Sequence, residues 1–140
     1  IVSYMNFLSQ NIKNKNDLQD NTGFVTINKE LVPNADNGKT LYVQHCASCH
    51  QLDGQGLYPN NTYMFPAIAG SQSFNDGAGM ARTYTAAAFI KGNMPLGQEG
   101  MLTEQQAVDI AYYFSHLERP IFANKADDWP KGGAPKDVRR

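Results

Sequence analysis

The sequence predicts an all-α fold in which helices are joined by long loops. Apolar residues recur at helical spacing near the N-terminus, in the middle and near the C-terminus of the chain. No stretch keeps the apolar–polar alternation of a strand for long, and 12 glycines with 7 prolines indicate much loop. With 41% apolar and 18% charged residues, the 140-residue chain has the composition of one globular domain with some excess at the ends.

The first element expected is an amphipathic helix over residues 1–12. Ile1, Tyr4 and Leu8 follow helical spacing on its apolar face. Residues 11–28 are rich in Asn, Asp and Lys, which indicates a polar linker. A helix that buries an apolar face and then meets a linker resembles the end of a preceding unit.

A second helix is expected to begin shortly after residue 34 and to lead into the two cysteines. Asp36 or Asn37 can cap its start. Gly38 and Tyr42 lie four residues apart and therefore share one face. A glycine there allows a second helix to approach closely, while the aromatic ring fills the space beside it.

A long loop and a short helix are expected beyond the cysteines. Residues 51–75 contain glycines and prolines that make regular structure improbable. The run over residues 84–91 is helical in character, and Gly92 is expected to cap its C-terminus. A tight loop over residues 92–97 follows.

The last helix has the clearest signals at both of its ends. Thr103 and Gln106 form the sequence pattern of a capping box, so the helix should begin there. Apolar residues continue at helical spacing as far as Leu117. Pro120 cannot continue a helix, which places the C-terminal end before it.

The run Cys46-Ala47-Ser48-Cys49-His50 is the most informative part of the sequence. Two thiols three positions apart can each form a thioether to a different vinyl group of one porphyrin. The adjacent His50 then lies beneath the ring, with an imidazole nitrogen available to the iron. The chain has 2 cysteines and both belong to this run, so none remains for a disulfide. The motif predicts one covalent haem c, bound through Cys46 and Cys49, with His50 as an iron ligand.

Two other interpretations of these residues are weaker. A zinc site needs four ligands in a tetrahedron, and the adjacent Cys49 and His50 can hardly converge on one small ion. His45 and Cys46 would have to complete that site, because no second cysteine pair exists. A thioredoxin-like redox pair would need a preceding strand within alternating strands and helices, and the pattern shows neither.

The second axial ligand of the iron decides what such a haem can do. Met94 is the best candidate, because Gly92 and Pro95 bracket it in a non-helical loop with enough chain to travel around the ring from His50. The other candidates considered were Met64, Met80, Met101, His45 and His116. Met64 is the second choice. Met80 and Met101 are expected to fill the core, and His116 to be a surface or packing residue.

A thioether ligand opposite a histidine favours the reduced iron and leaves no position for oxygen or a substrate. The expected chemistry is therefore electron transfer, with no catalytic residue in this chain. A haem that is itself catalytic or senses a small molecule would need a vacant or labile ligand position.

Charge, hydropathy and motif together restrict location and partners. The net charge of −1 gives no general attraction to nucleic acid or to an anionic membrane. No apolar run approaches the roughly 18–20 residues of a membrane span. The first residue is Ile, so a mature or truncated chain is expected. Haem attachment at such motifs takes place outside the bacterial cytoplasmic membrane, so we expect a periplasmic protein.

Several stretches resemble known proteins. Gly38 and Tyr42, with His50 and Met94 as implied axial ligands, resemble a class I cytochrome c domain. The resemblance is closer to the C-terminal haem domain of dihaem thiosulfate dehydrogenases. The matching runs are residues 73–80 (SFNDGAGM), 84–91 (YTAAAFIK), 93–97 (NMPLG) and the tail 128–135 (DWPKGGAP). In that family a first haem couples two thiosulfates to tetrathionate and the second haem relays electrons.

This resemblance implies a particular division of the chain. Residues 1–33 would be an N-terminal helix and linker from the end of a preceding haem domain. Residues 34–120 would be the cytochrome c domain, and residues 121–140 an extended C-terminal arm. The resemblance implies an electron relay whose partner is a redox protein or that preceding haem domain, within a parent thiosulfate dehydrogenase. The alternative is a stand-alone soluble cytochrome c that serves another oxidoreductase or an oxidase.

Overall fold

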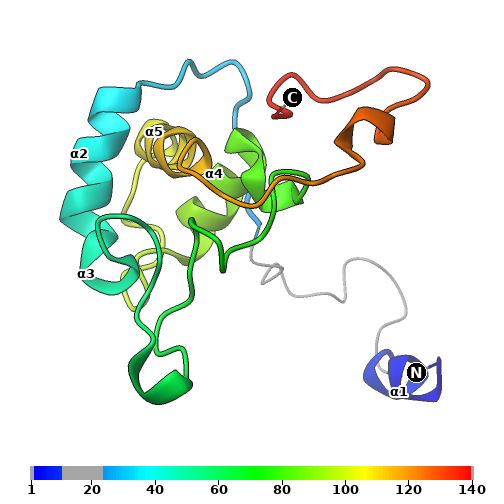
Figure 1. Ribbon diagram of the computed structural model, residues 1–140, viewed down its shortest axis with the longest axis horizontal. Coiled ribbons are helices and arrows are strands. Elements are labelled where there is room, and N and C mark those ends of the chain that lie inside the picture. Colours follow the sequence, from blue (N-terminus) through cyan, green and yellow to red (C-terminus); the bar gives the residue numbers. More distant parts are fainter. Residues whose placement is uncertain (1, 11–23, 140) are drawn as a thin grey trace.

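The computed structural model describes residues 2–10 and 24–139, and within them the fold is helical. Three helices form the body, with α5 packed against both α2 and α4 (Figure 1). Leu57 and Phe65 form an isolated antiparallel bridge, and the described residues contain no β-strand beyond this bridge. The prediction of an all-α fold is confirmed. The α-helices are α1 (Val2–Leu8), α2 (Ala35–His45), α3 (Ala47–His50), α4 (Thr83–Asn93) and α5 (Glu104–Ser115), and the 3₁₀ turns are η2 (Pro59–Asn61), η3 (Gly79–Ala81) and η4 (Lys125–Asp127).

The crossing of α2 over α5 depends on Gly38. A Cβ atom on Gly38 would lie 2.6 Å from the carbonyl carbon of Asp109 and 3.1 Å from Cβ of Tyr113. Only a glycine lets the two helix backbones approach this closely. One turn later Tyr42 is fully buried, and its ring lies 5.4 Å from that of Tyr113 at an angle of 54°. The predicted close contact at Gly38 and Tyr42 is confirmed.

A buried carboxylate joins the start of α2 to α5. Asp109 is 1% exposed, and its Oδ1 accepts hydrogen bonds from the Asn34 N–H at 2.9 Å and from Gln105 Nε2 at 2.7 Å. Its Oδ2 accepts one from Asn37 Nδ2 at 2.7 Å. The prediction that Asp36 or Asn37 caps α2 was wrong by two or three residues. Asn34 is the N-cap, because its side chain accepts from the Asn37 N–H while its own N–H is fixed by Asp109.

The start of α5 was predicted correctly, whereas the end of α4 was not. Gln106 N–H donates to Thr103 Oγ1 at 3.2 Å and Thr103 N–H donates to Gln106 Oε1 at 2.9 Å, which completes the capping box. Gly92 does not cap α4, which continues to Asn93. The Asn93 side chain donates to the carbonyl of Phe89, which supports this last turn.

The chain segments outside the three main helices are placed as follows. α1 lies apart from the other helices in Figure 1, and its apolar side chains are exposed, with Val2 72% and Phe7 64% accessible. The linker expected over residues 11–28 lies outside the described residues as far as residue 23. Beyond it, Ile27 is buried against the core, and the Val25 N–H donates to the carbonyl of Ala88 in α4. No helix of the described residues is long and apolar enough to cross a membrane.

Candidate haem site

The two cysteines and His50 lie on a single helical turn at the end of α2. The Cys46 N–H still bonds to the Tyr42 carbonyl at 2.8 Å, and the His50 N–H bonds to the Cys46 carbonyl at 2.9 Å. Both thiols are free and partly exposed. This turn therefore fixes the spacing of the thiols relative to the imidazole, as two thioethers to one porphyrin require.

The imidazole of His50 is oriented by a backbone carbonyl. Its Nδ1 lies 3.0 Å from the oxygen of Pro66, so Nδ1–H is assigned as the donor and Nε2 is left to bind a metal. This kind of partner fixes the ring orientation and raises the basicity of a ligating histidine. Pro66 belongs to the loop that sequence reasoning treated only as irregular, so this partner was missed. Because the partner is a backbone carbonyl, no side chain in the sequence indicates it.

Two glycines hold this loop against His50. The Gly56 N–H donates to the His50 carbonyl at 2.9 Å, and the backbone of Gly56 has a φ of +72°. A Cβ atom there would lie 2.6 Å from the carbonyl carbon of Pro66, so the close approach requires glycine. The carbonyl of Gly54 accepts from the N–H groups of Ile68 and Ala69 at 2.8 and 2.9 Å. The Pro66 carbonyl is therefore placed by backbone bonds on both sides of it.

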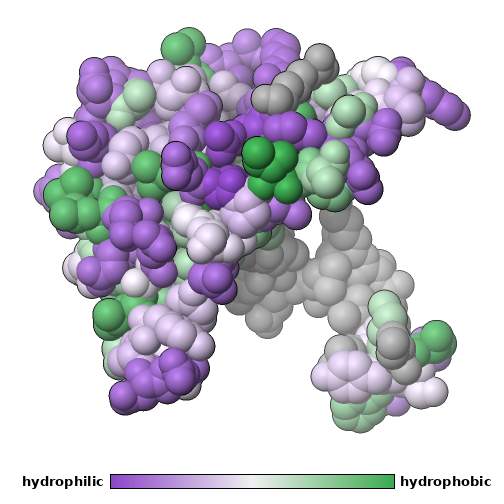
Figure 2. Space-filling view, in the orientation of Figure 1, coloured by the Kyte–Doolittle hydropathy of each residue, from purple (hydrophilic) through white to green (hydrophobic). Residues whose placement is uncertain are grey.

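Met94 lies at the other end of the site, at the C-cap of α4. Its N–H still bonds to the Ile90 carbonyl at 2.9 Å, and its extended backbone turns the chain out of the helix. The side chain is partly buried against the hydrophobic core, as are Cys46 and the neighbouring Ala47. On the face of the molecule in view, Figure 2 shows apolar residues as separate small patches among hydrophilic ones.

The other sequence candidates for the second ligand are placed differently. Met64 is 62% exposed on the loop surface. Met80 packs against the core as expected, whereas Met101 is 50% exposed, so its assignment to the core was wrong. His116 is an exposed surface histidine whose Nδ1 lies 2.7 Å from the Tyr112 carbonyl.

The alternative uses of the cysteines find no support in the site. Burial, and then the neighbouring Cys49, raise the pKa of the Cys46 thiol to about 11. A reactive redox pair needs a lowered pKa, because the thiolate is the nucleophile. Among the described residues no group of three or more His, Cys, Asp and Glu side chains could together hold a metal ion. The two cysteines are therefore suited to forming thioethers, and one imidazole nitrogen of His50 is left for iron.

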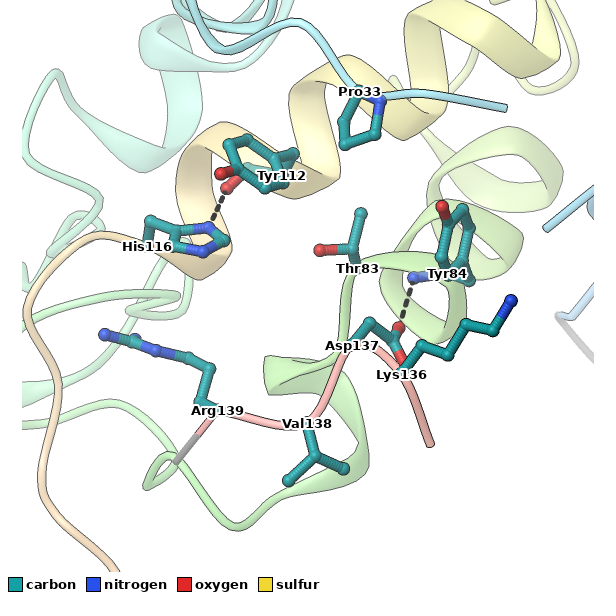
Figure 3. A pocket seen from close by; sticks show the side chains of 9 residues that line it. All are labelled: Pro33, Thr83, Tyr84, Tyr112, His116, Lys136, Asp137, Val138 and Arg139. Atoms are coloured by element: carbon teal, nitrogen blue, oxygen red, sulfur yellow. Dashed lines mark hydrogen bonds between the residues drawn. The ribbon is translucent and has the colours of Figure 1, made fainter. Parts of the chain in front are cut away.

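A separate cavity of about 540 Å³ lies away from these residues (Figure 3). It is bounded by the start of α4, the last turns of α5 and the C-terminal arm. There Asp137 of the arm accepts a hydrogen bond from the Tyr84 N–H at 2.9 Å. The residue before α4, Arg82, gives no side-chain cap, so Asp137 supplies one from the other end of the domain. The cavity marks where the arm docks.

Comparison with known proteins identifies the family. A family model described as Cytochrome c matches residues 35–118. The chain belongs to the cytochrome c family. It is 60% identical to the thiosulfate dehydrogenase of Psychrobacter arcticus over 141 residues, which cover 100% of this chain and 43% of that protein. It is 38% identical to the thiosulfate dehydrogenase of Allochromatium vinosum over 129 residues, or 91% of this chain and 47% of that protein.

A solved structure agrees with these relatives. The thiosulfate dehydrogenase TsdBA from Marichromatium purpuratum matches with a TM-score of 0.69 and 37% identity, covering 82% of this chain and 25% of that chain. The sulfane dehydrogenase SoxCD from Paracoccus pantotrophus, at 18% identity and a TM-score of 0.51, shares the fold. The cytochrome c chain thus spans less than half the length of the curated relatives described above.

Membership of this family implies a covalent haem c, and the residues present fit that group. Cys46 and Cys49 supply two thiols on one helical turn, and His50 presents Nε2 while Nδ1 is held by Pro66. Elsewhere among the described residues, half-buried Arg119 keeps two buried guanidinium nitrogens without a partner.

Proposed function

We propose that this chain is an electron-transfer domain with one haem c, bound through Cys46 and Cys49 and ligated axially by His50 and Met94. The single observation that carries the proposal is the bond between His50 Nδ1 and the Pro66 carbonyl, which leaves Nε2 for iron beside both thiols. The bound haem would supply a one-electron iron couple. The protein holds that iron between an imidazole and a thioether, a pair that favours the reduced state.

The position of Met94 supports it as the second ligand. Met94 shares the partly buried margin of the core with Cys46 and Met80, whereas Met64 and Met101 lie at the surface. Met80 lies within the 3₁₀ turn η3, and Met94 lies outside any helix. It follows α4 directly, so the helix fixes its backbone on one side. With both axial positions filled, no position remains for a substrate at the iron. The role that fits these ligands is carrying electrons.

We further propose that the domain is the electron relay of a thiosulfate dehydrogenase or tetrathionate reductase-like protein in the bacterial periplasm. Support comes from the 60% identity over the whole chain to a much longer thiosulfate dehydrogenase. Its partner would be a preceding haem domain or another redox protein. The exposed apolar face of α1, including Val2 and Phe7, is suited to packing against such a domain.

The ligand assignment is tested by substituting methionines one at a time in the holoprotein. Oxidised haem with a methionine ligand has a weak long-wavelength absorption band. Met94→Ala should abolish this band, and the reduced variant should bind carbon monoxide rapidly. Met64→Ala and Met80→Ala are the matched controls and should leave both properties unchanged. If Met94→Ala keeps the band, Met94 is not the ligand.

The relay role is tested separately by sequencing the complete gene. A second C-x-x-C-H motif upstream of residue 1, in the same reading frame, is the expected result. An open reading frame that encodes only this domain after a leader would instead support a stand-alone cytochrome. The domain should also accept electrons from the purified parent enzyme during thiosulfate oxidation, which stopped-flow absorbance of the haem would record.

A further inference from the structure

Arg119 is a half-buried cation just beyond the end of α5. Its Nη2 donates to the Phe114 carbonyl at 2.8 Å. The guanidinium lies over the ring of Phe74, 4.7 Å from its centroid, and 5.9 Å from that of Phe114. One hydrogen bond and two aromatic neighbours thus hold the group in place.

The same guanidinium is incompletely bonded. Within the described part of the chain, Nε and Nη1 are buried and have no hydrogen-bond partner. Burial, and then the neighbouring cation of Arg139, lower the pKa of Arg119 to about 10. Buried donors without partners cost free energy, and a buried charge without a counter-charge costs more. Nε and Nη1 are therefore donors that an anion could satisfy.

The neighbouring charged groups do not supply that anion. Arg139 is a second cation, and its Nη1 donates to the carbonyls of Ser115 and Leu117 at 2.7 and 3.3 Å. Asp76 is the nearby carboxylate whose charge raises the pKa of Arg119, but its Oδ2 forms a salt bridge with Lys125 Nζ at 2.7 Å. Arg82 and Asp128 line a small cavity together with Asp76, Lys125 and Arg139. With Arg119 these groups comprise four cations and two carboxylates, so the cluster keeps a net positive charge.

The loop that orients His50 is also hydrogen-bonded to the residue before Arg119. The Gly70 N–H, four residues beyond Pro66, donates to the Glu118 carbonyl at 2.7 Å, and Arg119 is the next residue. A Cβ atom on Gly54 in the same loop would lie 3.4 Å from Leu117. Leu117 and Phe74 are partly buried against the core, as are Cys46 and Met94. A backbone bond therefore ties the residue before Arg119 to the loop that orients His50, and Phe74 beneath the guanidinium shares the margin of the core with Cys46 and Met94.

We infer that Arg119 donates hydrogen bonds to a propionate of the bound haem and keeps that propionate ionised. Haem c carries two carboxylates, and a carboxylate buried at a protein wall needs donors and a positive charge. Nε and Nη1 of Arg119 offer both. The inference rests on the haem attachment proposed above, but not on the identity of the second iron ligand.

The experiment measures the reduction potential of the holoprotein against pH in Arg119→Gln. An adjacent guanidinium lowers a carboxylate pKa by about 1–3 units, so its loss should raise the propionate pKa by that amount. A new pH-dependent step in the potential should therefore appear. Resonance Raman spectra should show a shift of the propionate-bending band, which is independent of activity.

Arg139→Gln is the matched control, because it removes the same charge from a neighbouring residue whose Nη1 is already bonded to backbone carbonyls. It should leave the propionate band and the pH profile close to those of the parent.

If Arg119→Gln fails to fold, a second pair of variants replaces it. Arg119→Lys keeps the charge and should still shift the propionate band, whereas Arg139→Lys should not. An unmoved band in both Arg119 variants, or equal shifts in the Arg119 and Arg139 variants, would overturn the inference. In that case the long-wavelength absorption band of the methionine ligand would still be present, so the proposed ligation of the iron would be unaffected.

Discussion

Replacing Gly38 by alanine tests whether the crossing of α2 and α5 organises the domain. In an exposed helix this change would stabilise the protein by about 1 kcal/mol, because alanine is the better helix former. At Gly38 the new Cβ would lie 2.6 Å from the carbonyl carbon of Asp109 and 3.1 Å from Cβ of Tyr113. Both atoms lie in the α5 backbone or are bonded directly to it, so the helices must separate.

The size of the effect follows from what that separation breaks. Overpacking a tight contact costs about 1–3 kcal/mol. Moving α5 outward also strains the hydrogen bonds from Asn34 and Asn37 to Asp109, and bonds to a charged group contribute about 1.5–3 kcal/mol each. Partial loss of one bond, less the propensity gain of about 1 kcal/mol, gives a net loss of about 1–3 kcal/mol.

Urea denaturation of the holoprotein, followed by circular dichroism and haem absorbance, measures this loss. Lys39→Ala is the matched control, because Lys39 is exposed on the same helix and its substitution should change stability by less than about 0.5 kcal/mol. If Gly38→Ala is as stable as the parent, the two backbones are not in the contact described and this account of the crossing is wrong.

Three further changes probe polar contacts. Asp109→Ala should lower the free energy of unfolding in urea by at least about 1.5–3 kcal/mol, because it leaves donors at the start of α2 unpaired; an unchanged midpoint would refute this. Burial acts to raise the pKa of Asp76, but bonds from Lys125 and a backbone N–H outweigh it and lower that pKa. The stability gained is complete above the unfolded pKa of about 3.9 and is lost as pH falls through the lower folded pKa, so Asp76→Asn should flatten the acid side of a stability–pH profile. Thr103→Ala should cost about 1 kcal/mol in thermal unfolding, whereas Thr103→Ser keeps the capping oxygen and should be close to neutral; equal losses would mean that the capping bond contributes nothing.

The sequence predicted those parts of the fold that depend on local signals. The capping box of Thr103 and Gln106 is formed by residues three positions apart, so its pattern is visible in the chain. The spacing of Gly38 and Tyr42 likewise indicates a helix face suited to close approach. The end of α4 was missed because Gly92 was taken as a cap, while helical bonds continue as far as the Met94 N–H.

Contacts between distant segments could not be predicted from one sequence. Asp109 bonds to the backbone of Asn34, 75 residues earlier, and no pattern in the chain pairs them. The Pro66 carbonyl that orients His50 is a backbone atom, so its side chain gives no signal for this role. The chemistry of Cys46, Cys49 and His50 was readable because it depends on spacing within five residues. The parts that orient this chemistry depend on tertiary structure.

Asp109 in α5 and Arg119 just beyond its end differ in how their polar groups are satisfied. Asp109 is buried and Arg119 half-buried, and the protein itself supplies three hydrogen-bond donors to Asp109. Arg119 receives one acceptor from the protein and keeps two buried nitrogens without a partner in the described residues. The crossing with α2 is therefore complete in the polypeptide alone, whereas the hydrogen bonding of Arg119 is complete only when an anionic group binds to it. A fold built in this way can hold its cysteines and histidine in position before the haem is attached, and it gains its last polar contact from the haem.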